Sequence, residues 1–362
     1  MIRPRSAHAG DTLAASPPSA SVLSLPPSAP APGAAAAAGG WNRLLAEAVR
    51  DPAELLRLLE LPAAMLPGAV AAARTFPLLV PRGFAALMRR GDPRDPLLRQ
   101  VLPLADEEVA MPGFSADPLT ERACAPAPGL LHKYAGRALL VTTGACAVHC
   151  RYCFRRHYPY QELPRGRRWW EPALAYLRDD PSLHELILSG GDPLTLPDAQ
   201  LGELAHELAG IPHLRRLRVH SRLPVVLPER IDEAFLGWFT GTRLAPVLVI
   251  HANHARELCA PVAAALARVR RAGAIVLNQS VLLAGVNDEV AVLAELSQRL
   301  FEVGALPYYL HQLDRVQGAG HFLVDDQRAL ALARGLAASL PGYLVPRLVR
   351  EEAGMPGKMP LM

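Results

Sequence analysis

The chain has 362 residues, 51% of them hydrophobic and 20% charged, a composition typical of a globular protein with one large domain or two ordinary ones. The formal charge is +4, basic residues are scattered and apolar runs are short, so neither a nucleic-acid partner nor a membrane span is expected. Five cysteines, three of them clustered, argue against a disulfide framework and favour a metal site in a reducing compartment, which predicts a cytoplasmic protein.

Residues 1–40 are rich in Ala, Pro, Ser and Gly. A segment of this composition cannot bury enough apolar surface to offset the entropy lost on ordering, which predicts a disordered extension. Arg3 and Arg5 could begin a targeting sequence, but Pro and Ser interrupt every apolar run that follows them. We therefore do not expect a signal peptide.

Residues 41–130 are predicted to form an N-terminal helical domain and a connector. From Trp41 to about residue 100 the apolar residues recur at helical spacing, and the Asp51-Pro52 pair is typical of the start of a second helix. The stretch 101–130 contains MPGFSADPL and CAPAPG, which indicate an extended connector.

Residues 131–340 alternate between short apolar runs and stretches of helical length. The runs are RALLVTTG, ELILSGGD, RRLRVHSR, APVLVIHANH, AIVLNQSVLL and LPYYLHQL, and the clearest helical stretches are 198–210, 257–272 and 288–303. Six such alternations predict an α/β fold with a parallel sheet and right-handed crossovers. Polar residues end each run, which places the chemistry at one rim of a partial, TIM-like (β/α)6 barrel. A C-terminal segment, 341–362, follows it and begins with a further strand-like run, YLVPRLVRE.

Three cysteines with C-x3-C-x2-C spacing, Cys146, Cys150 and Cys153, follow the first predicted barrel strand within GACAVHCRYCFRRHYPY. Three thiolates are one short of a closed zinc site, although His149 or His157 could complete a Cys3His set, so spacing alone leaves zinc open. An iron–sulfur cluster held by three thiolates would keep one iron free for an exogenous ligand. The place of the loop at the catalytic rim favours the cluster, and we predict that neither histidine reaches the metal.

Lys358 is one of only two lysines in the chain and lies in a Gly/Pro loop after the last predicted strand. It could be a solvated tail residue. A lysine amine in such a loop could also hold pyridoxal phosphate as a Schiff base, which is chemistry that no other side chain supplies. The phosphate of that cofactor would need cations, for which Lys133, Arg137 and Arg222 are candidates.

The cysteine spacing at the end of the first strand of a partial barrel resembles that of radical S-adenosylmethionine enzymes. SGGDPL at 189–194 resembles the glycine-rich stretch of that family at the second strand end. The resemblance implies a 4Fe–4S cluster whose open iron chelates S-adenosylmethionine, with the glycine-rich stretch close to the methionyl amino group. The residues implied for that stretch are Ser189, Gly190, Gly191 and Asp192.

From about residue 41 to the end the chain resembles the lysine 2,3-aminomutase family. The motifs that carry this resemblance are HKYAGR, CRYCFRR, SGGDPL, SRLPVVLPERI, NQSVLLAGVND, LPYYLHQLD and the terminal G-x-x-G-K loop. GACAVHCRYCFRRHYPY, YYLHQLDRVQGAGHF and the short tail after Lys358 are most similar to the branch that makes (R)-β-lysine for modification of elongation factor P. The resemblance implies an isomerase that uses pyridoxal phosphate on Lys358.

The resemblance also implies where a lysine substrate binds. Arg155, two positions after the last cysteine, would bind the carboxylate, although it could equally be a surface arginine. Asp314 and Glu351 would bind the ε-ammonium, because an unpaired buried charge is costly. The alternative for Asp314 is a turn cap, and for Glu351 an exposed acid. The longer family members carry Asp at the position of Glu351. An anionic glutamate substrate would be repelled by this acidic pair.

Three further polar residues, His251, Asn253 and Gln279, follow the fourth and fifth predicted strands and are expected to face S-adenosylmethionine or pyridoxal phosphate. The reaction implied by the resemblance moves the α-amino group of lysine to the β-carbon through a radical that the deoxyadenosyl radical initiates. Implied partners are L-lysine, an electron donor such as flavodoxin or ferredoxin, and a ligase acting on elongation factor P. The sequence leaves open whether the chain forms a homo-oligomer. A zinc-stabilised binding protein of the translation machinery is the alternative from another class.

Overall fold

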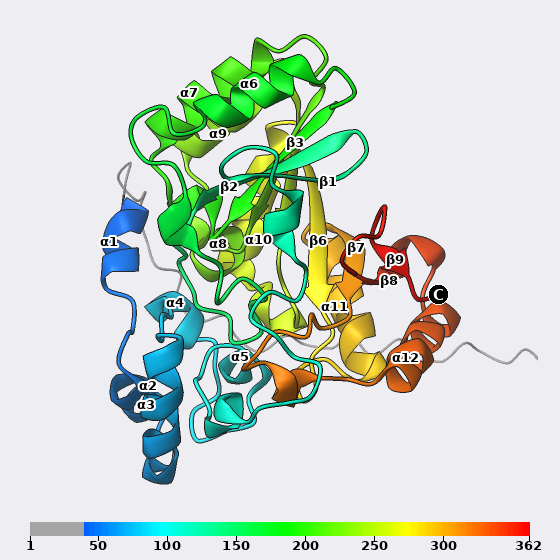
Figure 1. The fold of residues 1–362 in the computed structure, drawn as a ribbon. Helices are drawn as coiled ribbons and strands as arrows, with labels where there is room; N and C mark the ends of the chain where they lie inside the picture. Colours follow the sequence, from blue (N-terminus) through cyan, green and yellow to red (C-terminus); the bar gives the residue numbers. More distant parts are fainter. Residues whose placement is uncertain (1–39) are drawn as a thin grey trace, which may run out of the picture. The chain divides into compact units, whose positions relative to one another are not determined.

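The structure is a computed structural model that describes residues 40–362 (Figure 1). The prediction of a disordered extension at 1–40 therefore lies outside the described residues, except for Gly40. The N-terminal part of the described chain is helical, as the sequence predicts. Its helices are α1 (Gly40–Ala46), α2 (Pro52–Leu58), α3 (Leu66–Thr75), α4 (Arg82–Ala85) and α5 (Pro96–Arg99).

The start of α2 confirms the predicted cap. The Asp51 side chain accepts a hydrogen bond from the backbone N–H of Ala53 at 2.9 Å, and Pro52 occupies the first helical position. The connector that follows α5 is irregular rather than simply extended. It contains two 3-10 helices, η2 (Ala105–Glu108) and η3 (Glu121–Cys124), each of which carries one buried glutamate.

The centre of the fold is a nine-stranded sheet whose strands lie in chain order. The strands are β1 (Leu130–Tyr134), β2 (Arg137–Thr143), β3 (Glu185–Gly190), β4 (Arg216–Ser221), β5 (Ala245–Ile250), β6 (Ile275–Val281), β7 (Leu306–His311), β8 (Arg347–Arg350) and β9 (Met359–Pro360). The six predicted barrel strands are β2 to β7, and all are parallel. The expected number of six is nevertheless too low. The strand-like run near 347 becomes β8, which pairs parallel with β7 and makes a seventh parallel strand.

The two edge strands are antiparallel. LLHKY forms β1 and turns back into β2, and the chain turns back after β8 to form β9.

Figure 1 shows the crossover helices around the sheet, with α6, α7 and α9 at one end of the view and α11 and α12 beside the C-terminal strands. The helices after β2 are α6 (Glu171–Asp179), α7 (Asp198–Ala209), α8 (Leu223–Val226), α9 (Glu233–Thr240), α10 (Ala260–Arg271), α11 (Val290–Glu302) and α12 (Asp326–Ser339). The predicted stretches at 198, 257 and 288 correspond to α7, α10 and α11. Short 3-10 helices lie at η1 (Ala63–Met65), η4 (Tyr160–Glu162), η5 (Pro193–Thr195), η6 (Pro228–Arg230), η7 (Ala255–Glu257), η8 (Gly320–Phe322) and η9 (Gly342–Leu344).

Side chains, rather than strand pairing, bring the two ends of the sheet together. Lys133 in β1 lies 3.2 Å from Glu351, which follows β8 at the other end of the strand order. No hydrogen-bonded pairing joins β1 to β9 within residues 40–362. The sheet is therefore curled but open, which confirms the predicted partial barrel.

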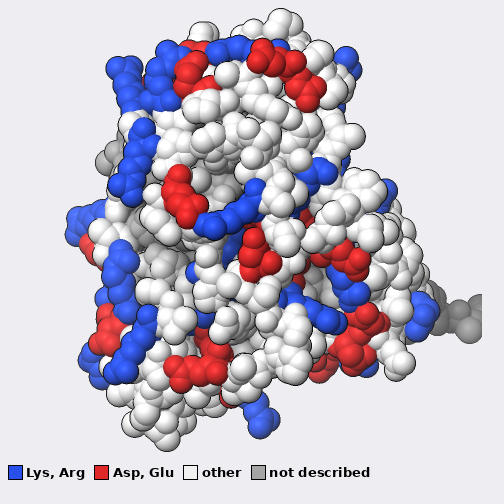
Figure 2. Space-filling model, in the orientation of Figure 1, with Lys and Arg blue, Asp and Glu red and all other residues white. Residues whose placement is uncertain are grey.

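The N-terminal helices and the barrel share one hydrophobic core. Leu55, Phe84 and Leu98 from the helices belong to the same buried cluster as Leu188 and Leu248 from the sheet. All five cysteines lie within the described residues and are free, as the clustering predicts. No helix among residues 40–362 is long and apolar enough to cross a bilayer. On the face seen in Figure 2 acidic and basic side chains are interspersed, with a run of basic ones along the left margin.

Candidate active site

A cavity of about 370 Å³ lies at the carboxyl ends of the parallel strands, the rim where the sequence places the chemistry. All the predicted site residues line it except Asn253. The lining ones are Cys146, Cys150, Cys153, Ser189, Gly190, Gly191, Asp192, Lys133, Arg137, Arg222, His251, Gln279, Arg155, Asp314, Glu351 and Lys358.

The loop that carries the three cysteines, residues 144–153, leaves β2 and is anchored on the N-terminal helical segment. The backbone N–H of His149 donates to the carbonyl of Leu79 at 3.0 Å, and that of Arg151 donates to the carbonyl of Gln100 at 2.9 Å. On its other side the loop touches the glycine-rich turn after β3. A Cβ atom on Gly191 would lie 2.3 Å from the carbonyl oxygen of Ala145, so only glycine allows this approach.

Buried charges fasten the same loop. Both oxygens of Glu107 accept hydrogen bonds from the fully buried Arg151, at 2.7 and 2.6 Å, and Arg156 donates to the same carboxylate at 2.7 Å. The two guanidinium groups also lie over the ring of Phe76, at 4.8 and 4.7 Å. Bidentate pairs of this kind fix orientation as well as position.

The three thiols suit an iron–sulfur cluster better than a closed zinc site. A 4Fe–4S cluster binds each thiolate through a different iron, so its cysteines need not converge on one ion. In the described part of the chain no three His, Cys, Asp or Glu side chains are grouped to hold a single metal ion. Burial raises the pKa of Cys146 well above its ordinary value and that of Cys153 to about 11, so metal uptake must displace protons from these thiols.

The two nearby histidines each contact a backbone carbonyl group. His149 Nδ1 lies 2.8 Å from the carbonyl oxygen of Pro77, and its ring stacks on Phe76. His157 Nε2 lies 3.3 Å from the carbonyl oxygen of Gln317. These contacts occupy one ring nitrogen of each histidine, and the absence of both from the metal site stays a prediction.

Asp192 joins the turn after β3 to the turn after β4. Its carboxylate accepts hydrogen bonds from the Ser221 hydroxyl at 2.8 Å and from backbone N–H groups of Leu194, Arg222 and Leu223 at 2.8 to 3.2 Å. Burial raises its pKa to about 6 despite these bonds. The carboxylate therefore anchors two loops, and its contact with a cofactor stays a prediction.

The cavity also holds a chain of ion pairs. Arg155 donates two hydrogen bonds to Glu121, at 2.7 and 2.8 Å, and one to the Ser189 hydroxyl at 3.2 Å. Lys133 lies 3.3 Å from Glu121 and 3.2 Å from Glu351. Lys358 donates to Glu351 at 2.6 Å.

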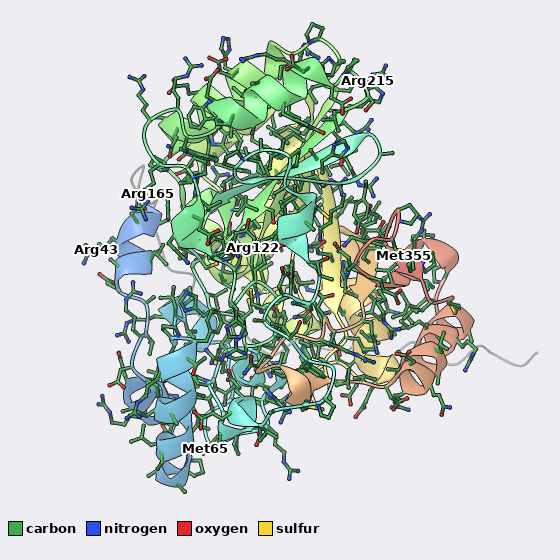
Figure 3. The ribbon with its side chains drawn as sticks, viewed as in Figure 1. Arg43, Met65, Arg122, Arg165, Arg215 and Met355 are labelled. Carbon is green, nitrogen blue, oxygen red and sulfur yellow. The ribbon has the colours of Figure 1, made fainter. Side chains whose placement is uncertain are left out.

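Glu121 is one site residue that the sequence did not predict. It is buried and lines the cavity, yet it lies in the irregular connector, where no periodicity indicates which side chains point inward. Its neighbour Arg122 points the other way, to Glu162 at 2.5 Å, and lies near the centre of the view in Figure 3. Arg155 and Lys133 hold the pKa of Glu121 below its usual value although burial opposes them.

The two predicted ammonium-binding acids lie close enough to influence each other. Burial, reinforced by the charge of Glu351, raises the pKa of Asp314 to about 7. Although burial acts in the opposite direction, the positive charges of Lys358 and Lys133 hold the pKa of Glu351 far below its usual range. Asp314 is therefore the member of the pair whose ionisation changes near neutral pH. Glu351 stays ionised and is already paired with Lys133 and Lys358.

Arg222 is in a different place from the one predicted. Its Nη1 donates to Cys150 Sγ at 2.6 Å and to the Tyr152 hydroxyl at 2.6 Å, and its Nη2 donates to Gln100 at 2.7 Å. Because both terminal nitrogens are occupied beside the cysteine loop, Arg222 is not placed as a phosphate ligand. Arg137, whose guanidinium lies 4.7 Å from the ring centre of Tyr134, remains next to Lys133 on the β1–β2 hairpin.

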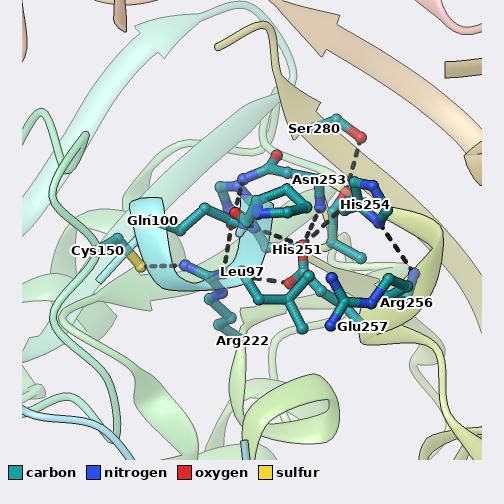
Figure 4. A network of polar contacts seen from close by, with 12 residues as sticks. Leu97, Gln100, Cys150, Arg222, His251, Asn253, His254, Arg256, Glu257 and Ser280 are labelled. Atoms are coloured by element: carbon teal, nitrogen blue, oxygen red, sulfur yellow. Dashed lines mark hydrogen bonds and ion pairs between the residues drawn. The ribbon is translucent and has the colours of Figure 1, made fainter. Parts of the chain in front are cut away.

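His251, Asn253 and Gln279 fall into two groups. His251 and Gln279 line the cavity, and burial lowers the pKa of His251 to about 3, so its ring is neutral. Asn253 is fully buried behind the cavity wall, where its amide nitrogen donates to Tyr152 at 2.7 Å and to Gln100 at 2.9 Å (Figure 4). The prediction that Asn253 faces a cofactor is therefore not met. It holds Tyr152, which lines the cavity.

Comparison with known proteins identifies the family. No protein-family model matches the chain. The chain is 52% identical over 323 residues to L-lysine 2,3-aminomutase of Escherichia coli strain K12, which covers 89% of this chain and 94% of that protein. It is 46% identical over 318 residues to L-lysine 2,3-aminomutase of Haemophilus influenzae, covering 88% and 94%.

Among solved structures, a radical SAM methyltransferase from Sphaerobacter thermophilus is 20% identical, with a TM-score of 0.43, over 61% of this chain and 68% of that one. That structural likeness is too slight to carry weight. The two identities extend over most of this chain and of both relatives, and by them the chain is an isomerase of the L-lysine 2,3-aminomutase family.

Proposed function

We propose that this chain converts L-α-lysine into (R)-β-lysine, using a 4Fe–4S cluster, S-adenosylmethionine and pyridoxal phosphate. The observation that carries the proposal is the single cavity in which the three cysteines, the glycine-rich turn, Lys358 and three charged substrate ligands meet. The names of the Escherichia coli and Haemophilus influenzae relatives support lysine as the substrate. Family membership also disfavours the alternative of a zinc-stabilised binding protein.

Cys146, Cys150 and Cys153 are proposed to bind three irons of the cluster, with the fourth iron facing the cavity. Gly190 and Gly191 line the same cavity and approach the backbone around Ala145, and S-adenosylmethionine is proposed to bind over them. The cluster and its ligand supply, when bound, the carbon radical that takes a hydrogen atom from the substrate. The surrounding residues hold the reactants together and keep water from the radical.

The residues around Lys358 fit pyridoxal phosphate. Its amine lies in the cavity, 5.7 Å from the ring centre of Tyr309, and the cations Lys133 and Arg137 stand nearby on one hairpin for a phosphate. His220 also lines the cavity. Its buried Nε2 atom has no hydrogen-bond partner among residues 40–362 and could form a hydrogen bond with a polar atom of the cofactor. Pyridoxal phosphate supplies, when bound, the carbonyl that takes up the migrating amine.

Substrate binding is proposed to exchange one set of ion pairs for another. Glu121 fixes Arg155 through its Nε and Nη2 atoms, and the lysine carboxylate is proposed to bind at the remaining Nη1 side of the guanidinium. Lys358 leaves Glu351 when its amine is engaged by the cofactor, which frees a carboxylate beside Asp314. The ε-ammonium of the substrate then restores the charge balance.

The product is proposed to serve the modification of elongation factor P, through a ligase that takes (R)-β-lysine. The support is the sequence of the cysteine loop and of YYLHQLDRVQGAGHF, which resemble that branch of the family. A flavodoxin or ferredoxin of the cytoplasm is proposed as the electron donor.

The experiment reconstitutes the protein anaerobically with iron and sulfide, and then adds L-lysine, S-adenosylmethionine, pyridoxal phosphate and dithionite. We expect about four irons per chain, the visible absorbance of a 4Fe–4S cluster, and β-lysine separable from α-lysine by chromatography. Cys150→Ala should lose iron and activity, whereas Cys259→Ser, outside the cavity at the start of α10, should keep both. Zinc uptake without a cluster would contradict the proposal and support the binding-protein alternative.

A further inference from the structure

Arg222 lies against the sulfur of a proposed cluster ligand. Its Nη1 is 2.6 Å from Cys150 Sγ, and only 6% of its side chain is exposed (Figure 4). A guanidinium in such a buried place is a strong local charge, because little water screens it. The proposed reaction assigns it no role, and its bonds exclude it from the phosphate site.

A second layer of residues fixes this guanidinium. Glu257, which is fully buried, accepts from Arg222 at 3.2 Å and from the side chain of Gln100 at 3.0 Å, and also from the backbone N–H groups of Asn253 and His254 at 2.8 and 3.0 Å. Gln100 in turn accepts from Nη2 of Arg222 at 2.7 Å. The guanidinium therefore has one orientation, set by groups from three separate parts of the chain.

The backbone of Arg222 is fixed as well. Its N–H donates to Asp192 at 2.8 Å, and Asp192 belongs to the glycine-rich turn that touches the cysteine loop. Both ends of the residue are thus held relative to the cysteines. A side chain anchored in this way can keep a hydrogen bond to a sulfur atom when the charge on that sulfur changes.

We propose that Arg222 is a positioning residue that donates a hydrogen bond to the Cys150 thiolate and thereby raises the reduction potential of the cluster. This inference rests on the proposed cluster site. Reduction adds one electron to the cluster, and a nearby cation and a hydrogen bond to sulfur stabilise the added negative charge. Glu257 offsets part of the charge of Arg222, but Arg222 is the group in contact with the sulfur.

The test measures the midpoint potential of the reconstituted cluster by redox titration monitored by electron paramagnetic resonance, without S-adenosylmethionine. Omitting that ligand separates an effect on the cluster from an effect on ligand binding. In R222Q the ratio of reduced to oxidised cluster, measured at the midpoint potential of the wild type, should fall about tenfold. For a one-electron couple this corresponds to a midpoint potential lowered by about 59 mV. R222K keeps the charge but not the fork, so its shift should have the same sign and be smaller.

The matched control is R230Q, which removes another fully buried arginine, one that bonds Leu194 and Asp198 instead of a cysteine. Its midpoint should equal that of the wild type. An R222Q protein with full iron content and an unchanged midpoint would overturn the inference. If R222Q holds no cluster, R222K decides: a lowered midpoint supports the inference and an unchanged one refutes it. Loss of the cluster from both Arg222 variants would overturn the inference, because Arg222 would then be needed to hold the cluster and not to set its reduction potential. A wild-type protein without a cluster would instead refute the proposed cluster site itself.

Discussion

Glu351 is the residue at which the two lysines of the cavity meet. It accepts hydrogen bonds from Lys133 and Lys358, and its charge reaches Asp314. Its position seven residues before Lys358 was found in the sequence through the family resemblance. Its pairing with both lysines was not, because Lys133 is more than 200 positions away.

The raised pKa of Asp314 predicts how lysine binding depends on pH. Burial and Glu351 raise this pKa to about 7, while Lys358 and Lys133 oppose them. Only the ionised carboxylate attracts the substrate ammonium, so binding is strongest above pH 7 and weakens as the pH falls through this value. Between about pH 8 and about pH 6 the ionised fraction drops about tenfold, and the KM for lysine should rise accordingly.

Steady-state kinetics of the reconstituted enzyme across this range checks the prediction. Asp314→Asn should have a high KM that no longer follows the pH, since the titrating group is gone. The same pH slope in Asp314→Asn and in the wild type would assign the titration to another group.

Lys358 should carry the cofactor. Treating the protein with pyridoxal phosphate and borohydride should leave a pyridoxyl group on the peptide that contains Lys358, as detected by mass spectrometry. Lys358→Arg should abolish this adduct and Lys133→Arg should retain it. An adduct on Lys133 instead would reverse the roles of the two lysines.

At the scale of elements, the cysteine loop depends on the helical N-terminal segment. Glu107→Gln should leave two buried guanidinium groups without their carboxylate and lower the free energy of unfolding by about 3–5 kcal/mol. Urea denaturation measures the loss, and iron retention after reconstitution should fall with it. Glu47→Gln, which removes a solvent-exposed partner of Arg43, should change neither quantity measurably. Equal losses in the two variants would show that the buried pairing of Glu107 with Arg151 and Arg156 stabilises the protein no more than an exposed ion pair does.

The contact between the cysteine loop and the turn after β3 can be tested in the same way. Gly191→Ala would place a methyl group 2.3 Å from the Ala145 carbonyl oxygen, so one of the two loops must move. We expect the variant to fold but to bind less than about half as much iron per chain as the wild type after reconstitution. Gly237→Ala in α9, where a new Cβ meets nothing within 4 Å, is the control and should bind iron normally. Full iron in Gly191→Ala would mean that the cluster tolerates a displaced turn.

At the scale of the whole molecule, the sequence predicted what is local and missed what is distant. Strand runs, helix caps and cysteine spacing depend on neighbouring residues, and β2 to β7, the α2 cap and the rim position of the site are as predicted. The pairing of Glu121 with Arg155, of Glu107 with Arg151 and of Arg222 with Cys150 joins segments 34 to 72 positions apart. No periodicity records such pairs.

The division of the chain also belongs to this scale. The boundaries between 41–130, 131–340 and 341–362 stay predictions, and the shared core of the N-terminal helices and the sheet makes the first of them a boundary of secondary structure more than of packing. The terminal segment contributes β8 and β9 to the same sheet, beside the loop that carries Met355 in Figure 3.

The scarcity of lysine has a practical consequence for chemical labelling. The two ε-amines of the chain both border the cavity, with only 14% and 20% of their side chains exposed. Amine-reactive dyes, cross-linkers and immobilisation resins usually attach to surface lysines and leave an active site alone. For this protein we expect the reverse: apart from the chain terminus, an acylating reagent meets its targets only inside the cavity. The extent of labelling would then report cavity access, and a bound substrate or cofactor should protect the protein from modification.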